Sequence, residues 1–203
     1  MGRFVRYNVQ MESKKIVIIC GHPDADSFSG NLLDKYQAAA EDAGHQVRRF
    51  NLGQLQFDPI LHKGYKEIQQ LEPDLITLRD AITDCNHLVI GYPNWWCTMP
   101  ALLKGLFDRF WLPGFAFNFN KQTKRIEQHL TGRTGRVFIL SGSHSPFNMW
   151  WKFGDYTNEI QYGILEFAGI KTSVSSYGPC EKVDDKTRAK WLHEVELLGK
   201  AGK

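Results

Sequence analysis

The stretch IGYPNWWCTMPALLKGLFDRFWLPGFAFNF, residues 90–119, decides the fold of this chain. It begins as the end of an apolar strand and continues into a proline-aromatic loop. It then enters a helix at Pro100, because proline fits the first turn of a helix. It ends in an extended segment with phenylalanine at every second position. A loop that presents Trp95 and Trp96 beyond a strand end offers large apolar surface, which normally covers a flat ligand or another subunit.

Strand patterns and helical patterns alternate along the chain on both sides of this stretch. We expect strands at residues 15–20, 47–52, 87–91, 136–141 and 171–177. We expect helices at residues 28–43, 65–83 with an interruption near Pro73, 100–112, 155–168 and 184–198. This alternation predicts an α/β, three-layer, flavodoxin-like fold with a five-stranded parallel sheet in the order 2-1-3-4-5.

The composition argues against several classes of protein. The chain has 203 residues and a formal net charge of +3, and its lysines and arginines are scattered, so we expect no nucleic-acid partner. It has no apolar run of about 18 residues, so we expect no stable membrane insertion. Its four cysteines have no metal-ligand spacing and no disulfide framework, which predicts no metal site and a cytoplasmic location.

The first loop of interest follows the first strand. In a sheet of this order, ligands bind outside the carboxyl ends of the strands, near the switch point between strands 1 and 3. Residues 21–29 (GHPDADSFS) lead from strand 1 into a helix whose first N–H groups lack partners and form an anion site. His22 and Ser27 can add side-chain donors to a phosphate. The alternative is a plain capped turn.

The second loop, residues 93–97 (PNWWC), has the properties that a flavin ring requires. The ring is flat and apolar, and it needs a stacking surface and backbone N–H groups at its pyrimidine edge. Two indoles and a proline-rigidified backbone can supply both. The alternative is that Trp95 and Trp96 pack under neighbouring loops. In the helix that follows, Lys104 and Asp108 form an i,i+4 pair, which on its own is usually a surface salt bridge.

The third loop, residues 141–147 (SGSHSPF), begins with small residues that let the backbone approach a ligand ring closely. His144 can donate a proton in catalysis, although a lone loop histidine is more often solvated. The alternative for the whole loop is flexibility. Elsewhere, Phe115, Phe117 and Phe119 alternate with smaller residues, which predicts one aromatic face that forms a pocket wall or a subunit interface.

Two blocks of sequence resemble the flavodoxin-like NAD(P)H:quinone oxidoreductase family, which includes DT-diaphorase, the modulator of drug activity and the potassium-efflux ancillary reductases. The first block is His22 with Ser27 and Phe28. The second, residues 92–119, resembles the family pattern P-x-x-W…P-A-x-L-K-G-x-x-[DE]-R…G-x-A-[FY]. We therefore divide the chain into an N-terminal extension, residues 1–13, and a flavodoxin-like flavin-binding domain, residues 14–203.

The resemblance implies a non-covalently bound flavin and a homodimer with its active site at the subunit interface. It implies two-electron, ping-pong transfer from NAD(P)H to a quinone or a similar flat electrophile. The residues that it assigns to the flavin phosphates are His22, Asp26, Ser27, Phe28 and Ser29. Those that it assigns to the flavin ring are Pro93, Asn94, Trp95, Trp96 and Cys97, with Ser141 and Gly142 at the pyrimidine edge.

The resemblance also bears on the cofactor's length and on the source of protons. Asp108 stands where members with the longer cofactor place an acid near the adenine, which favours FAD, with FMN left open. A tyrosine and a histidine thought to buffer charge on the reduced flavin align with Phe147 and Phe153, which cannot move protons. Two tyrosines of the substrate pocket align with Phe117 and Phe119. The expected substrate pocket, formed by Phe117, Phe119 and Phe147, is therefore more apolar, and His144, solvent and backbone N–H groups remain as proton donors.

Two other functions stay open on the sequence. One is a one-electron carrier of the flavodoxin type, although such carriers usually have a hydroxyl-rich phosphate loop and an acidic surface. The other is a regulatory ancillary subunit of a membrane transporter, a role that the efflux-ancillary members of the family have.

Overall fold

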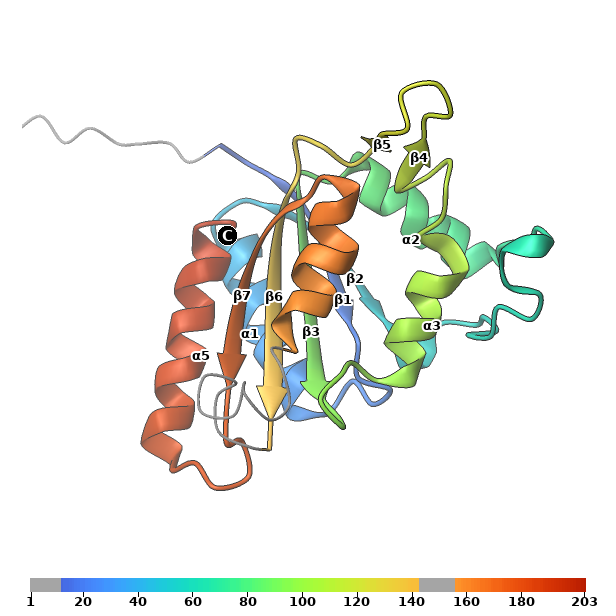
Figure 1. The fold of residues 1–203 in the computed structure, drawn as a ribbon. Coiled ribbons are helices and arrows are strands. Elements are labelled where there is room, and N and C mark those ends of the chain that lie inside the picture. Colours follow the sequence, from blue (N-terminus) through green and yellow to red (C-terminus); the bar gives the residue numbers. More distant parts are fainter. Residues whose placement is uncertain (1–11, 143–155) are drawn as a thin grey trace, which may run out of the picture.

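A computed structural model describes residues 12–142 and 156–203. Its centre is a five-stranded sheet in the order β2-β1-β3-β6-β7, with every neighbouring pair parallel (Figure 1). The strands are β1 (Lys15–Cys20), β2 (Gln46–Asn51), β3 (His87–Asn94), β6 (Thr134–Ser141) and β7 (Lys171–Tyr177). Counted along the chain, this order is 2-1-3-4-5, so the predicted fold class is confirmed.

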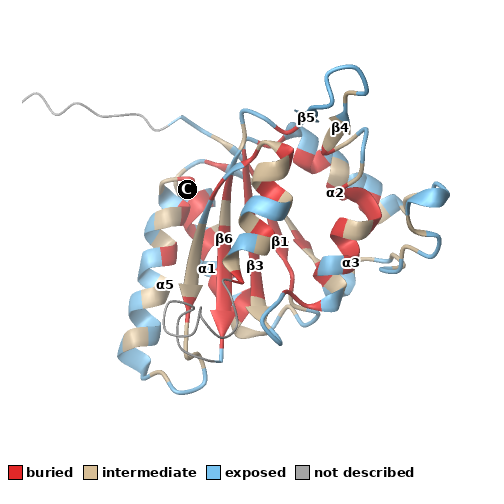
Figure 2. Ribbon diagram, in the orientation of Figure 1, coloured by how far each residue is buried: buried red, intermediate tan, exposed pale blue. Residues whose placement is uncertain are grey.

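Helices cover both faces of this sheet and complete three layers (Figure 1). One face carries α1 (Phe28–Asp42) and α5 (Asp185–Lys200), which share an apolar core with one side of the strands. The other face carries α2 (Pro73–Asp84), α3 (Ala101–Phe110) and the π-helix η4 (Glu159–Leu165). Figure 2 shows the buried residues gathered along the strands and the inner sides of the helices. Across the described ranges, no helix is both long and apolar enough to cross a bilayer.

Strand β1 shows why this sequence forms a buried central strand. Its residues from Ile16 to Cys20 are at most 2% exposed. Alternate side chains of β1 enter the two opposite cores, because helices cover both faces of the sheet. A continuous run of apolar and β-branched residues is therefore required here, where a half-buried strand would alternate.

The predicted helix at residues 65–83 is wrong in its first half. Helix α2 begins at Pro73, and residues 55–72 follow an irregular path with one short 3₁₀ turn, η2 (Gly64–Lys66). A second 3₁₀ turn, η1 (Leu52–Gln54), precedes them. Proline cannot continue a helix from its N-terminal side, and it forces the preceding residue out of the helical region. Accordingly, Glu72 is extended, with φ −68° and ψ 158°.

Besides shifts of one or two residues at the ends of several elements, three further features differ from the expectation. Strand β3 runs to Asn94, past Gly91, because β6 pairs beside it as far as Ser141. A small antiparallel pair, β4 (Phe117–Phe119) with β5 (Ile126–Gln128), was not expected. The helix expected at residues 155–168 is, over most of its described part, η4 followed by the 3₁₀ turn η5 (Glu166–Ala168).

Candidate functional site

The carboxyl edge of the sheet brings the beginnings of the three predicted loops together. The His22 ring, after β1, meets the Trp95 indole, after β3, edge to face at a centroid distance of 5.3 Å. At the ends of β3 and β6, the side-chain amide nitrogen of Asn94 (Nδ2) donates to the Ser141 hydroxyl over 3.4 Å. The first contact lies at the carboxyl ends of the paired strands β1 and β3, which is the predicted switch point, and the second lies beside it, between β3 and β6.

Among the described residues, the loop after β1 leaves backbone amides without acceptors at the start of α1. Ser27 caps the helix, and its hydroxyl accepts from the Gly30 amide over 3.3 Å. In the described part of the chain, no acceptor pairs with the amides of Phe28 or Ser29. A Cβ at Gly30 would lie 1.7 Å from the Ala25 carbonyl oxygen, so only glycine permits this close approach. The free amides and the helix dipole favour a bound anion.

Polar and charged groups surround these free amides. The His22 Nδ1 atom lies 2.8 Å from the Asp24 carbonyl oxygen and 2.9 Å from the Asp24 amide nitrogen, so the loop backbone fixes the ring, and the tautomer decides which of the two it pairs with. The Asp26 amide donates to an Asp24 carboxylate oxygen over 2.9 Å, and the Asp26 side chain is exposed. From α5, the Arg188 guanidinium lies 5.0 Å above the Phe28 ring. Arg188 was not predicted, and it adds positive charge next to Phe28.

The ring loop, residues 95–98, is a two-residue turn with an unusual backbone. Trp95 and Thr98 exchange both backbone hydrogen bonds, at 3.0 and 3.1 Å. The central residues Trp96 and Cys97 have φ of 55° and 64°, the signature of a type I′ turn, which normally requires asparagine or glycine. Left-handed backbone at a non-glycine residue costs about 1–3 kcal/mol. Sequence reasoning placed the loop correctly but gave no sign of this conformation.

The side chains of the ring loop are open to solvent. Trp96 is 98% exposed and Trp95 is 42% exposed. The alternative that Trp96 packs under a neighbouring loop is therefore wrong, whereas Trp95 is partly covered by its contact with His22. Cys97 is exposed as well. Pro93 and Asn94, which the sequence assigned to the loop, are the last two residues of β3.

These groups fit a flavin. The side-chain amide oxygen of Asn94 (Oδ1) is buried and has no hydrogen-bond donor among the described residues, so it leaves an acceptor for a ligand N–H. The exposed indoles offer flat apolar surface, and the α1 amides suit a phosphate. A ring next to β3 and phosphates at α1 use all three features at one edge of the sheet.

The third loop is described only at its start. The Ser141 carbonyl accepts from the Cys180 amide over 2.9 Å, which joins the loop after β7 to the site. Among the described residues, a Cβ at Gly142 would meet only the Glu181 carboxylate, at 3.7 Å or more. The predicted residues His144 and Phe147, and the aligned Phe153, lie outside the described residues.

The predicted aromatic row does not form one face. Phe115 lies in a turn and stacks on Phe110 at 5.5 Å, whereas Phe117, in β4, packs edge-on against Phe167 at 4.9 Å. Phe119 is 53% exposed. The row is broken because the extended backbone covers only residues 117–119.

The Lys104–Asp108 pair on α3 is confirmed. The Lys104 ammonium lies 2.7 and 2.9 Å from the two Asp108 carboxylate oxygens. This is the surface ion pair that the spacing predicts. A role for Asp108 beside an adenine stays a prediction.

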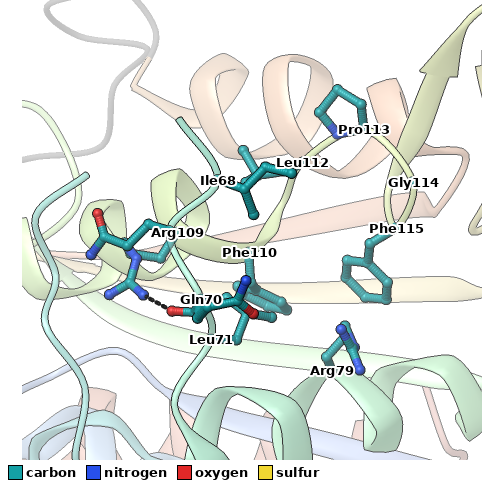
Figure 3. A pocket seen from close by; sticks show the side chains of 11 residues that line it. Ile68, Gln70, Leu71, Arg79, Arg109, Phe110, Leu112, Pro113, Gly114 and Phe115 are labelled. Atoms are coloured by element: carbon teal, nitrogen blue, oxygen red, sulfur yellow. Dashed lines mark hydrogen bonds between the residues drawn. The ribbon is translucent and has the colours of Figure 1, made fainter. Parts of the chain in front are cut away.

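A buried guanidinium that the sequence did not reveal holds residues 55–72, which we call the long loop. Arg109 of α3 is 0% exposed and pairs with both Glu72 carboxylate oxygens, at 3.0 and 2.9 Å. It also donates to the Gln70 carbonyl over 2.8 Å (Figure 3) and to the Asp58 carbonyl. Burial raises the pKa of Glu72, but hydrogen bonds from Arg109 and the Asp58 amide outweigh this effect and leave that pKa lowered.

Two hollows separate the long loop from the chain after α3. One, of about 350 Å³, extends from Arg109 to Phe115 (Figure 3). The other, of about 530 Å³, has Tyr65, Trp111 and Phe117 among its walls. Phe117 is thus a wall of a hollow of this chain, and its place in a substrate pocket stays a prediction.

Comparisons with known proteins agree with this fold. A protein family described as having a flavodoxin-like fold matches residues 14–195. NAD(P)H dehydrogenase [quinone] 1 of Cavia porcellus is 25% identical over 189 residues, which cover 78% of this chain and 66% of that protein. The chain thus spans slightly less than two thirds of that relative.

Two solved structures share the fold. An NAD(P)H:quinone oxidoreductase from Methanothermobacter marburgensis aligns with a TM-score of 0.78 at 23% identity, over 95% of this chain and all of that chain. An FMN-dependent NADH-azoreductase from Bacillus anthracis, in complex with FMN, aligns with a TM-score of 0.73 at 17% identity, over 91% of this chain and 96% of that chain. With its sheet order, its site at the carboxyl edge and a match over residues 14–195, the chain belongs to the family of proteins with the flavodoxin-like fold.

Proposed function

We propose that this protein is a flavin-dependent NAD(P)H:quinone oxidoreductase. The observation that carries the proposal is the meeting of three features at one edge of the sheet. They are the exposed Trp96 indole and, without partners among residues 12–142 and 156–203, the first α1 amides and the Asn94 Oδ1 atom. The family of the chain and the name of the guinea-pig relative support the same chemistry.

In this proposal each group has a defined task. The amides of Phe28 and Ser29, with Ser27, hold the flavin phosphates, and Arg188 adds positive charge beside them. The ring loop and Asn94 orient the flavin ring. A flavin held by these residues would supply the redox chemistry, which is hydride transfer from NAD(P)H and two-electron transfer to a quinone-like acceptor. His144 remains the proposed proton donor, and its replacement by Ala should change the pH profile of turnover.

The absorption spectrum of the purified protein tests the cofactor. We expect a yellow protein with flavin bands, and a colourless protein that takes up neither FAD nor FMN would overturn the proposal. Reductive titration distinguishes the first alternative, because a one-electron carrier accumulates a blue semiquinone, whereas the reductase passes directly to the two-electron form. If a pull-down with this protein recovers a membrane transporter, and still does so after the flavin is removed, the regulatory alternative would be favoured.

The length of the cofactor is a separate prediction. Asp108 favours FAD through the family resemblance, whereas the solved azoreductase contains FMN. Acid release of the cofactor followed by chromatography decides between them, and recovery of FMN alone would show that the preference for FAD is wrong.

We also propose a cytoplasmic homodimer in which Phe117 and Phe119 face the partner's pocket. The exposed Trp96 and Phe119 are the kind of apolar surface that a second subunit covers. Loss of an aromatic side chain that contacts the flavin or the substrate should weaken the binding of that ligand by about 1–3 kcal/mol. Trp96→Ala should lower flavin retention, and Phe117→Ala should raise the quinone KM with flavin still bound. A fully active monomer in light scattering would contradict this site.

A further inference from the structure

One side-chain contact ties the ring loop to a distant element. The Thr98 hydroxyl donates to a Glu159 carboxylate oxygen over 2.7 Å, a typical distance for a charge-assisted bond. Thr98 is the last residue of the turn, and Glu159 is the first residue of η4. Among the described residues, this is the only side-chain hydrogen bond that joins residues 95–98 to another element.

The turn needs such a contact. Left-handed backbone at two non-glycine residues, Trp96 and Cys97, persists only where the surroundings hold it in place. The Trp95 side of the turn rests against His22 through a ring contact. The opposite side has the bond from Thr98 to Glu159, and after it the chain is fixed by Met99, which is 2% exposed.

The element that carries Glu159 is a firm support. Ile160 and Leu165 of η4 are both fully buried in the core of the sheet. The π-helical hydrogen-bond pattern of η4 is itself rare, and it occurs frequently at functional sites. A carboxylate at its first residue can therefore hold a loop at a fixed distance from the sheet.

We propose that Glu159 is a positioning residue that acts through Thr98 and keeps the ring loop in the conformation that binds the flavin ring. The identity of the ligand rests on the proposed function. The hold that Glu159 exerts on the loop does not, so the two can be tested separately.

The experiment uses Glu159→Ala, Thr98→Val and the double variant, each prepared with and without flavin. Hydrogen–deuterium exchange of residues 94–99 in the flavin-free protein reports on the loop itself. A fluorescence titration with flavin reports on binding. We expect about tenfold faster exchange and about tenfold weaker flavin binding for each single variant, since one charge-assisted hydrogen bond is lost. The double variant should be no worse than either single one.

Two variants control for general damage. Glu159→Gln keeps an acceptor for the Thr98 hydroxyl and should restore most of the affinity. Asn158→Ala, at the exposed neighbouring position, should change neither readout. Unchanged exchange, additive effects in the double variant, or faster exchange with normal flavin affinity would each overturn the proposal. If the unaltered protein binds no flavin, the proposed function fails, while the exchange data still decide whether Glu159 holds the loop.

Discussion

The ring loop and the long loop are held in place by different kinds of contact. Both lack regular secondary structure and both lie beside α3. The long loop is fixed by a fully buried guanidinium that pairs with Glu72 and binds backbone carbonyls. The ring loop has a left-handed turn, exposed indoles and one charge-assisted bond from its end. The difference shows that buried contacts hold the long loop, whereas the ring loop keeps its apolar side chains in solvent, which fits the ligand-binding role that we propose for it.

Arg109→Met should have the largest effect. It removes the charge that holds the long loop and leaves Glu72 and two carbonyls without their donor, so we expect a loss of about 3–5 kcal/mol in the free energy of unfolding. Urea unfolding measures it. Exchange should rise in the long loop and remain unchanged in the ring loop. Equal loosening of both loops would contradict the comparison.

Glu72→Gln should cost less, about 1–3 kcal/mol at pH 7, because the Glu72 side chain is 28% exposed and water can reach the site. Its effect depends on pH. The folded-state pKa of Glu72 is lowered from 4.5, so the unfolded state binds more protons below that pH, and the stabilisation is lost as pH falls. The difference between the two proteins should therefore shrink between pH 6 and pH 3. A constant difference would show that the charge of Glu72 contributes nothing.

Cys97→Gly should have the smallest effect on stability and the opposite sign. Glycine adopts a φ of 64° without a steric penalty, so we expect a gain of about 1 kcal/mol. Cys97→Ala keeps the Cβ and should gain nothing. Comparing the thermal unfolding of the two variants separates the strain of the left-handed backbone from the loss of the thiol. An equal gain in both would mean that the turn is not strained.

The sequence was sufficient for the parts of the fold that depend on local pattern. The buried run of β1, the cap at Ser27 and the position of the tryptophans after β3 each follow from neighbouring residues. The path of the long loop could not be predicted from neighbouring residues. Ile68 and Leu71 have helical spacing, but Pro73 and contacts with Arg109 prevent a helix there.

The remaining features depend on contacts between distant residues. Arg109 and Glu72 are 37 residues apart, and Thr98 and Glu159 are 61 residues apart, so no local sequence pattern predicts either pair. The turn conformation was equally invisible, since Trp-Cys is not a type I′ sequence. These tertiary contacts decide how the candidate site is held, whereas local pattern decides where it lies.

The ring loop also contains a native cysteine, Cys97, to which a thiol-reactive probe can be attached. Of the four cysteines, Cys20 and Cys85 are buried and Cys180 is partly covered, and burial raises the pKa of each of these three thiols. Cys97 alone is exposed, one residue from Trp96. A thiol-reactive dye should therefore modify the native protein at a single position, and its emission would follow the arrival of a ligand at the sheet edge without any engineered cysteine.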